Sequence, residues 1–171
     1  MSAYFREVFA IQAPALLRYV RRVTGSRADA EEIVQETFMK LHCQLSDGAE
    51  LPNVRAWLFR VATNAARDLE RERRVRAREQ APAPPTNVVD FETRLQNQQL
   101  TQLALRRLPR RMRQLLLLWS EGFSYREMAG VTGVEPGYIG VLLQRARAAF
   151  KKEFEQRDAV VGAGRNRDGL L

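Results

Sequence analysis

Residues 57–74, WLFRVATNAARDLERERR, combine the side chains that a protein uses to hold a nucleic acid. Arginines supply affinity for phosphates, and aromatic rings or amides such as Asn64 provide partners for unstacked bases. The alternative interpretation is a charged helix face stabilised by Glu70 and Glu72, with Trp57 as a core anchor, and both interpretations can hold together. The candidate contact residues are Arg60, Asn64, Arg67, Arg71, Arg73 and Arg74.

A second stretch, from Ser124 to Arg147, predicts two short helices joined by a turn. The small Ala129 suits a close helix crossing, and Gly133 tolerates the positive φ of the turn. The expected shared core is Met128, Val134, Ile139 and Leu142 or Leu143. In a helix-turn-helix the second helix enters the major groove of DNA, and basic Arg145 and Arg147 favour that interpretation over a plain helical hairpin. Its early exposed positions are nevertheless apolar: Tyr138, Gly140 and Val141, with Gln144 after them.

No stretch carries the pattern of an enzyme. The chain lacks a phosphate-binding glycine loop, a cluster of metal ligands and a nucleophile paired with histidine. The single histidine, His42, and the single cysteine, Cys43, are too few for a closed metal site, and one thiol cannot form an internal disulfide. We therefore expect no catalysis and no cofactor.

The overall composition fits a nucleic-acid-binding protein. The 171 residues carry a formal net charge of +8, and only three of the 28 basic residues are lysines. Arginine is the better residue for phosphates and base edges because its planar fork binds at two points. No apolar run approaches the length of a membrane span and the N-terminus lacks a signal peptide, so we expect a cytoplasmic protein.

Helical periodicity over most of the chain predicts an all-α fold with two small domains. Residues 1–78 form the first, 79–95 a linker that contains three prolines, and 96–155 the second, which holds the helix-turn-helix. We expect Pro14 in the first turn of a separate helix, and Ser26 or Asp29 as the cap of the next one. The tail, 156–171, is expected to be flexible.

Three stretches together resemble the bacterial RNA polymerase sigma factors of the extracytoplasmic-function (ECF) class. They are DAEEIVQETFMKLH, VRAWLFRVATNAARDLERERR and LPRRMRQLLLLWSEGFSYREMAGVTGVEPGYIGVLLQRARAAF. The resemblance covers residues 1–78 and 96–155, and it implies a factor that recruits core polymerase, recognises a promoter and opens it. An anti-sigma factor is a further partner that the class commonly has.

The resemblance also implies which residues make the contacts. The exposed face of the DAEEIVQETF helix is expected to bind the clamp helices of polymerase through Asp29, Glu32, Gln35, Glu36 and Phe38. The stretch 57–74 and the loop 45–53 before it are expected to hold the melted minus-ten element, with Asn64 near the pocket for a flipped base. The helix-turn-helix is expected to contact the minus-thirty-five duplex through Arg126, Tyr138, Val141, Gln144, Arg145 and Arg147.

Two other functions remain open at this point. A stand-alone helix-turn-helix regulator would bind duplex DNA without polymerase, but it does not need the acidic DAEEIVQETF face. A polymerase-binding decoy would use that face without reading promoters, which the apolar second helix leaves open. Family members generally carry a small hydroxyl residue and basic residues where this chain has Tyr138, Gly140, Val141 and Leu142.

Overall fold

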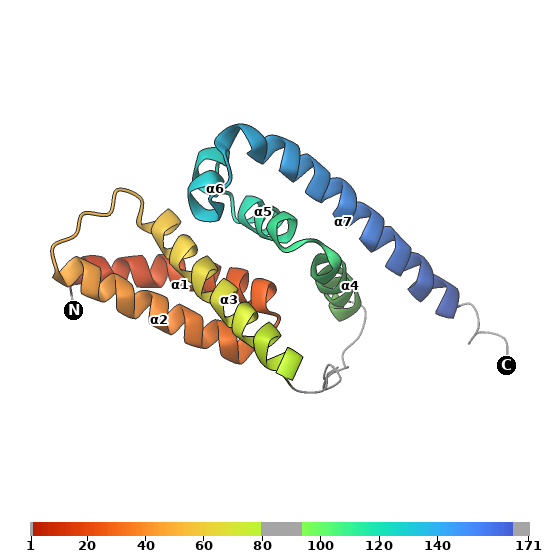
Figure 1. Cartoon of the computed structure of the whole chain (residues 1–171), viewed down its shortest axis with the longest axis horizontal. Helices are drawn as coiled ribbons and strands as arrows, with labels where there is room; N and C mark the ends of the chain where they lie inside the picture. Colours follow the sequence, from red (N-terminus) through yellow and green to blue (C-terminus); the bar gives the residue numbers. More distant parts are fainter. Residues whose placement is uncertain (1, 80–93, 166–171) are drawn as a thin grey trace.

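The computed structural model describes residues 2–79 and 94–165, and over these residues the chain is entirely helical, as predicted (Figure 1). The helices are α1 (Ala3–Thr24), α2 (Arg27–Ser46), α3 (Val54–Glu79), α4 (Arg94–Arg107), α5 (Arg110–Ser120), α6 (Tyr125–Thr132) and α7 (Pro136–Arg165). Most of the predicted linker, 80–93, lies outside the described residues. No described helix is both long and apolar enough to cross a membrane.

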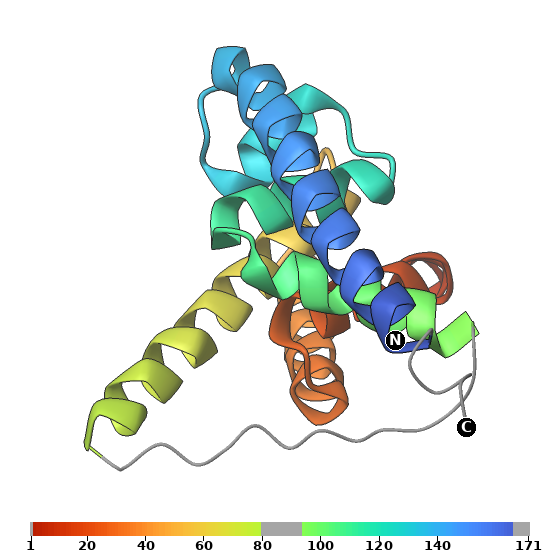
Figure 2. The same ribbon diagram turned by 90° about the vertical axis from the view of Figure 1, so that its right-hand side faces the viewer.

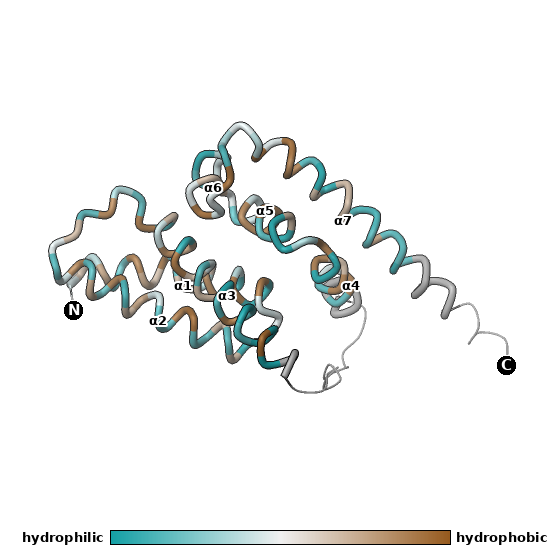
Figure 3. The backbone as a smooth tube through the Cα atoms, viewed as in Figure 1, coloured by the Kyte–Doolittle hydropathy of each residue, from teal (hydrophilic) through white to brown (hydrophobic). Residues whose placement is uncertain are grey.

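Helices α1, α2 and α3 pack together as an N-terminal module. Each presents one apolar stripe to the others, so that Leu16, Leu41 and Leu58 are fully buried between them. The Ser26 side chain accepts a hydrogen bond from the Asp29 backbone N–H and caps α2, which settles the choice of cap left open by the sequence. This module holds α3 so that its far end projects beyond α1 and α2, where its surface is strongly hydrophilic (Figure 3).

Pro14 lies inside the continuous helix α1 and not in the first turn of a second helix, so that expectation is wrong. A proline inside a helix removes one backbone hydrogen bond and usually costs about 3 kcal/mol. Here the burial of Phe5 before it, and of Leu16 and Val20 after it, keeps both halves of α1 against α2 and α3. Tertiary packing therefore outweighs the local cost.

Helices α4 to α7 form a C-terminal module in which the long helix α7 packs across α4, α5 and α6. Its core includes Leu115, Leu118, Met128, Ile139 and Leu143, each no more than 1% exposed. Helix α7 continues to Arg165, so residues 156–165 are helical where the sequence suggested a flexible tail. No proline interrupts this segment, and extending a helix that is already nucleated needs little additional stabilisation.

The two modules lie against each other and share one continuous core. Helix α6 packs on α3, and α5 packs on α1. The far end of α3, in yellow-green, projects away from the other helices (Figure 2). At the centre of this junction, the Phe123 ring from the α5–α6 connection lies 4.7 Å from the Phe59 ring of α3, measured between centroids. The sequence predicted two modules on a tether and gave no sign of this contact.

Candidate functional site

Helix α2 exposes three of the five residues predicted to bind polymerase. Glu32, Gln35 and Glu36 are all exposed on its surface. Phe38 is only 3% exposed, and its ring packs edge-on against Phe9 at 4.7 Å between centroids. Phe38 therefore supports the face from beneath. We call Glu32, Gln35 and Glu36 the polymerase face.

Asp29 does not lie on this exposed face, contrary to the expectation from the sequence. Its carboxylate is buried under α3 and accepts two hydrogen bonds of 2.7 Å from Nη1 and Nη2 of Arg73. These hydrogen bonds raise the pKa of the Arg73 guanidinium. The ion pair joins a predicted polymerase contact to a predicted DNA contact, and it links α2 to α3. The two residues are 44 positions apart, so helical spacing gave no signal of the pair.

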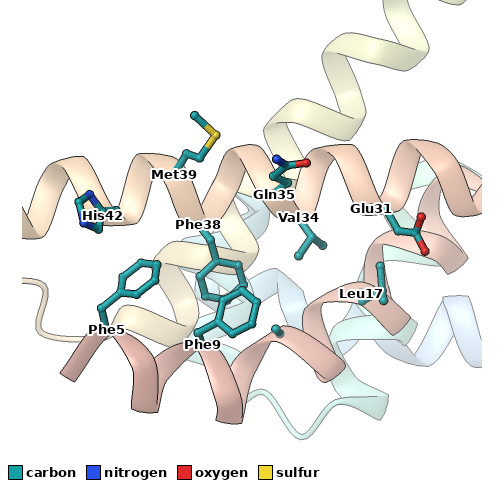
Figure 4. Close-up of a pocket in the computed structure, with 10 residues that line it drawn as sticks. Phe5, Phe9, Leu17, Glu31, Val34, Gln35, Phe38, Met39 and His42 are labelled. Carbon is teal, nitrogen blue, oxygen red and sulfur yellow. The ribbon is translucent and has the colours of Figure 1, made fainter. Parts of the chain in front are cut away.

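An apolar groove of about 590 Å³ lies between α1 and α2, directly beside the polymerase face (Figure 4). Its floor is Phe38 and Val34, and Gln35 stands on its rim. Phe9 is 47% exposed and Met39 is 62% exposed, which is unusual for side chains of this size. The full lining is Phe5, Phe9, Ala13, Leu17, Glu31, Val34, Gln35, Phe38, Met39 and His42. We call it the aromatic groove. Sequence reasoning missed it, although Phe5 and Phe9 at helical spacing were its signal.

His42 contributes its ring to this groove. The imidazole packs edge-on against Phe5, with 5.4 Å between the ring centroids. Within residues 2–79 and 94–165, no three His, Cys, Asp or Glu side chains come together as a possible metal site. Cys43 is exposed.

Helix α3 arranges most of the predicted single-strand contacts along one line. Positions 60, 64, 67, 71 and 74 recur every three or four residues, so their side chains lie above one another on one side of the helix. Arg60, Asn64, Arg71 and Arg74 are exposed, and Arg67 is half-buried. We call these five residues the arginine stripe. Arg73 points away from the stripe toward Asp29, and Arg74 is held by Glu70 through a 2.7 Å ion pair.

The opposite side of α3 packs in the core. Phe59 is fully buried, and the Tyr19 hydroxyl pairs with the Thr63 hydroxyl at 2.8 Å. Burial raises the pKa of Tyr19 to about 12, although the Thr63 hydrogen bond and nearby arginines act in the other direction. Trp57 packs half-buried against this core, in agreement with its expected role as an anchor. The arginine stripe is thus carried on a rigidly held helix.

Asn53 ends the loop that precedes α3 and makes two separate contacts. Its Oδ1 accepts a hydrogen bond of 2.8 Å from the Ala56 N–H, which caps α3. Its Nδ2 donates to Oε1 of Glu127 in α6 at 3.0 Å. The pKa of Glu127 is lowered, first by the backbone N–H of Ser124 and then by the Asn53 amide. The predicted single-strand loop therefore touches the helix-turn-helix in this arrangement.

The helix-turn-helix forms as the sequence predicts. Ser124 and Glu127 make a reciprocal capping box at the start of α6. Gly133 ends α6 with φ +70°, a left-handed conformation that glycine adopts without strain, and its N–H donates to the Ala129 carbonyl at 2.9 Å. The predicted core members Met128, Val134, Ile139 and Leu143 are buried, and so is Ala129, which was predicted at the helix crossing.

Every residue predicted to contact the minus-thirty-five duplex is exposed. Tyr138 is 65% exposed and Val141 46%, and Gln144 and Arg145 follow on α7. We call these four residues the reading face. Arg126 is exposed on α6. The structure therefore keeps the apolar start of α7 on the surface and does not use it in the core.

Arg147 has an aromatic neighbour that the sequence did not reveal. Its guanidinium lies over the Trp119 ring, 4.0 Å from the centroid. Trp119 is itself 47% exposed at the end of α5. Stacking on the ring orders the guanidinium while leaving its N–H groups free to donate.

Comparison with protein families identifies both modules. Residues 9–76 match the family model Sigma-70 region 2, and residues 98–150 match Sigma-70, region 4. The chain is 30% identical over 154 residues to the RNA polymerase sigma factor CarQ of Myxococcus xanthus, covering 86% of each chain. It is 28% identical over 162 residues to the ECF RNA polymerase sigma factor SigL of Mycobacterium tuberculosis, covering 91% of each chain.

Two solved structures have the same arrangement of helices. The sigma factor RpoE from Bartonella quintana, crystallised with the anti-sigma factor NepR, aligns over 90% of this chain and 98% of its own, with a TM-score of 0.77 and 25% identity. CnrH, in complex with the cytosolic domain of CnrY, aligns over 89% of this chain and 88% of its own, with a TM-score of 0.67 and 25% identity.

Proposed function

The chain belongs to the ECF RNA polymerase sigma factors, which direct RNA polymerase to promoters, and we propose how its surfaces divide that work. The N-terminal module, residues 1–78, binds polymerase and holds the minus-ten element. The C-terminal module, residues 96–155, binds the minus-thirty-five duplex, and residues 79–95 connect the two. Such a factor is not an enzyme: it makes and breaks no bond, and it acts in the cytoplasm, where polymerase works.

The polymerase face binds the clamp helices of core polymerase. Its exposed glutamates carry negative charge on a chain whose net charge is +8, which suits a basic helical partner. Phe38 packs against α1 and the Asp29–Arg73 pair joins α2 to α3, so both hold α2 in position. These two groups are positioning residues, and Glu32, Gln35 and Glu36 make the contacts.

The arginine stripe captures the melted strand of the minus-ten element. The observation that carries this proposal is the division of α3 into a core side, with Phe59 and Thr63 buried, and an exposed side with Arg60, Asn64 and Arg71. Guanidinium groups bind the phosphates, and the Asn64 amide hydrogen-bonds a base lifted out of the stack. A fixed helix keeps these groups in register with successive nucleotides.

The helix-turn-helix places α7 in the major groove of the upstream duplex. Arg126 and Arg147 lie beside the reading face and bind the phosphates on either side of it. Because the two DNA contacts are on one chain, binding of one raises the effective concentration of the other.

An anti-sigma factor regulates this chain by covering the aromatic groove and the neighbouring polymerase face. Support comes from the two similar structures, since RpoE is bound to the anti-sigma factor NepR and CnrH to the cytosolic domain of CnrY. An amphipathic helix with large apolar side chains would fill a groove lined by phenylalanines and Met39. Polymerase and such a helix would then compete for α2.

The test is run-off transcription by core polymerase on a pool of random promoter fragments, with and without the chain. Defined start sites that share an upstream pattern are expected only in its presence. The Asn64→Ala variant should bind core polymerase normally but open fewer promoters, while Glu32→Ala with Glu36→Ala should lose polymerase. Normal opening by Asn64→Ala would contradict the role given to the arginine stripe, and polymerase binding without opening of any fragment would identify a decoy.

A further inference from the structure

The outward face of α7 carries almost no hydrogen-bonding side chains in its first turns. Residues 136–143 are PGYIGVLL, in which the Tyr138 hydroxyl is the single polar side-chain group. Gly137, Val141 and Arg145 are spaced four positions apart, so they lie in one line along the helix. Ile139 and Leu143 lie on the buried side. Val141 is therefore at the centre of the surface that would face DNA, with Tyr138 on one flank.

Tyr125 of α6 closes the other flank. The position of a Cβ atom on Gly140 would be 3.4 Å from Cε2 of Tyr125, so the tyrosine ring lies against the backbone of α7 at this glycine. Tyr125 is 49% exposed. The Tyr125 ring therefore adds apolar surface beside α7, where Tyr138 and Val141 are exposed as well.

The charges around this surface favour DNA over an apolar protein partner. Arg126 is exposed directly after Tyr125 on α6, and Arg145 is exposed four positions after Val141 on α7. Gln144, next to Arg145, can form a bidentate pair with adenine. In the major groove the one apolar group that a base pair presents is the C5-methyl of thymine, and the minor groove has none. An apolar patch with arginines near it thus matches a thymine-bearing duplex.

We propose that α7 recognises the upstream promoter element through thymine methyl groups. Val141 contacts one methyl at the centre of the element, and Tyr138 and Tyr125 enclose it from either side. Gln144 and Arg145 add hydrogen bonds at the neighbouring base pairs. The inference rests on the proposed function of the C-terminal module, and it names Val141 as the residue that determines specificity there.

The test removes the methyl group and nothing else. Upstream duplexes are first selected from a random pool with the polymerase-bound chain, and in parallel with the free chain. Each thymine of the selected element is then replaced by deoxyuridine, one position at a time. Loss of one buried methyl is expected to weaken binding about fourfold at one or two positions. Replacing that T·A pair by 5-methylcytosine·guanine should be better tolerated than replacing it by cytosine·guanine.

Two variants assign the effect to Val141. Val141→Ala should bind the thymine duplex more weakly and no longer distinguish thymine from deoxyuridine. Val75→Ala is the matched control, because Val75 is equally exposed at 49% but lies on α3, and it should keep the full discrimination. Tyr138→Ala provides a second variant and should reduce discrimination in the same way.

Each remaining outcome is decisive. If deoxyuridine is tolerated at every position, or if Val141→Ala still distinguishes the two bases, the thymine inference is overturned. Polymerase binding and promoter opening are read separately, so they can persist in that case and leave the proposed function intact. Another outcome is that selection yields no preferred duplex and the Tyr138 and Val141 variants lose a protein partner instead. The apolar surface is then a protein-binding site, and the inference fails.

Discussion

Arg55→Ala should open the junction between the two modules. The Arg55 guanidinium lies over the Phe123 ring, 4.2 Å from its centroid, and its Nη2 donates to the Glu121 carbonyl. A hydrogen bond from a charged group contributes about 1.5–3 kcal/mol and a cation–π contact about 0.5–1 kcal/mol. Removing both should weaken the closed arrangement by about 2–4 kcal/mol, a factor of about 30 to 1,000 in the equilibrium between closed and separated modules.

Fluorescence energy transfer across the junction measures this equilibrium. Cys43 is exposed on α2 and is the one cysteine of the chain, so it accepts the first dye, and Lys152→Cys on the exposed side of α7 accepts the second. Transfer should fall in Arg55→Ala and stay unchanged in Arg76→Ala, an exposed arginine on the same helix. Because Arg55 belongs to the N-terminal module, the folding of the C-terminal module should not be affected. Equal transfer in Arg55→Ala and the unsubstituted chain would refute the account of what holds the junction.

Four further predictions concern single side chains. Asn64→Ala should reduce the permanganate reactivity of the melted minus-ten strand about 5- to 100-fold, since a base-edge contact contributes about 1–3 kcal/mol, and unchanged reactivity would exclude the contact. Arg73→Ala should lower the free energy of unfolding in urea by about 1–3 kcal/mol, because it leaves the Asp29 carboxylate without its partner. A decrease below about 0.5 kcal/mol, the usual effect of a surface substitution, would contradict a stabilising role for the pair. Because the pKa of Glu127 is lowered on folding, its ionised carboxylate stabilises the fold above the unfolded-state pKa, and this stabilisation is lost as the pH falls through the folded-state pKa. Urea titrations from neutral to acidic pH should therefore show a steeper fall in the free energy of unfolding than the same titrations of Glu127→Gln. The raised pKa of Tyr19, about 12, means that stability should fall above pH 10, and Tyr19→Phe should not show this loss in ultraviolet-monitored unfolding.

Local features of the fold were predictable because they depend on neighbouring residues. The turn at Gly133 and the cap at Ser26 follow from backbone conformation and from hydrogen bonds within a few positions. The exposure of Tyr138 and Val141 also followed from helical periodicity alone. Within one helix, the periodicity of the sequence determines which side chains face outward.

Contacts between distant segments were not predictable by this reasoning. Asp29 belonged by spacing to an exposed face, yet Arg73 covers it from a different helix. Pro14 has a strong local preference for a helix start, but packing on both sides of it overrides that preference. The position of one module on the other depends on which aromatic rings meet, and single-sequence patterns contain no information on that pairing.

The shared core at Phe59 and Phe123 has a consequence for how such chains can be recombined. When the C-terminal module of this chain is replaced by that of a relative, the exchange separates Phe59 from Phe123, whose rings pack at 4.7 Å. A chimera should therefore fold into the closed arrangement only if the residues at positions 59 and 123 come from the same parent. A design that transfers promoter preference from one sigma factor to another would then have to transfer both positions together.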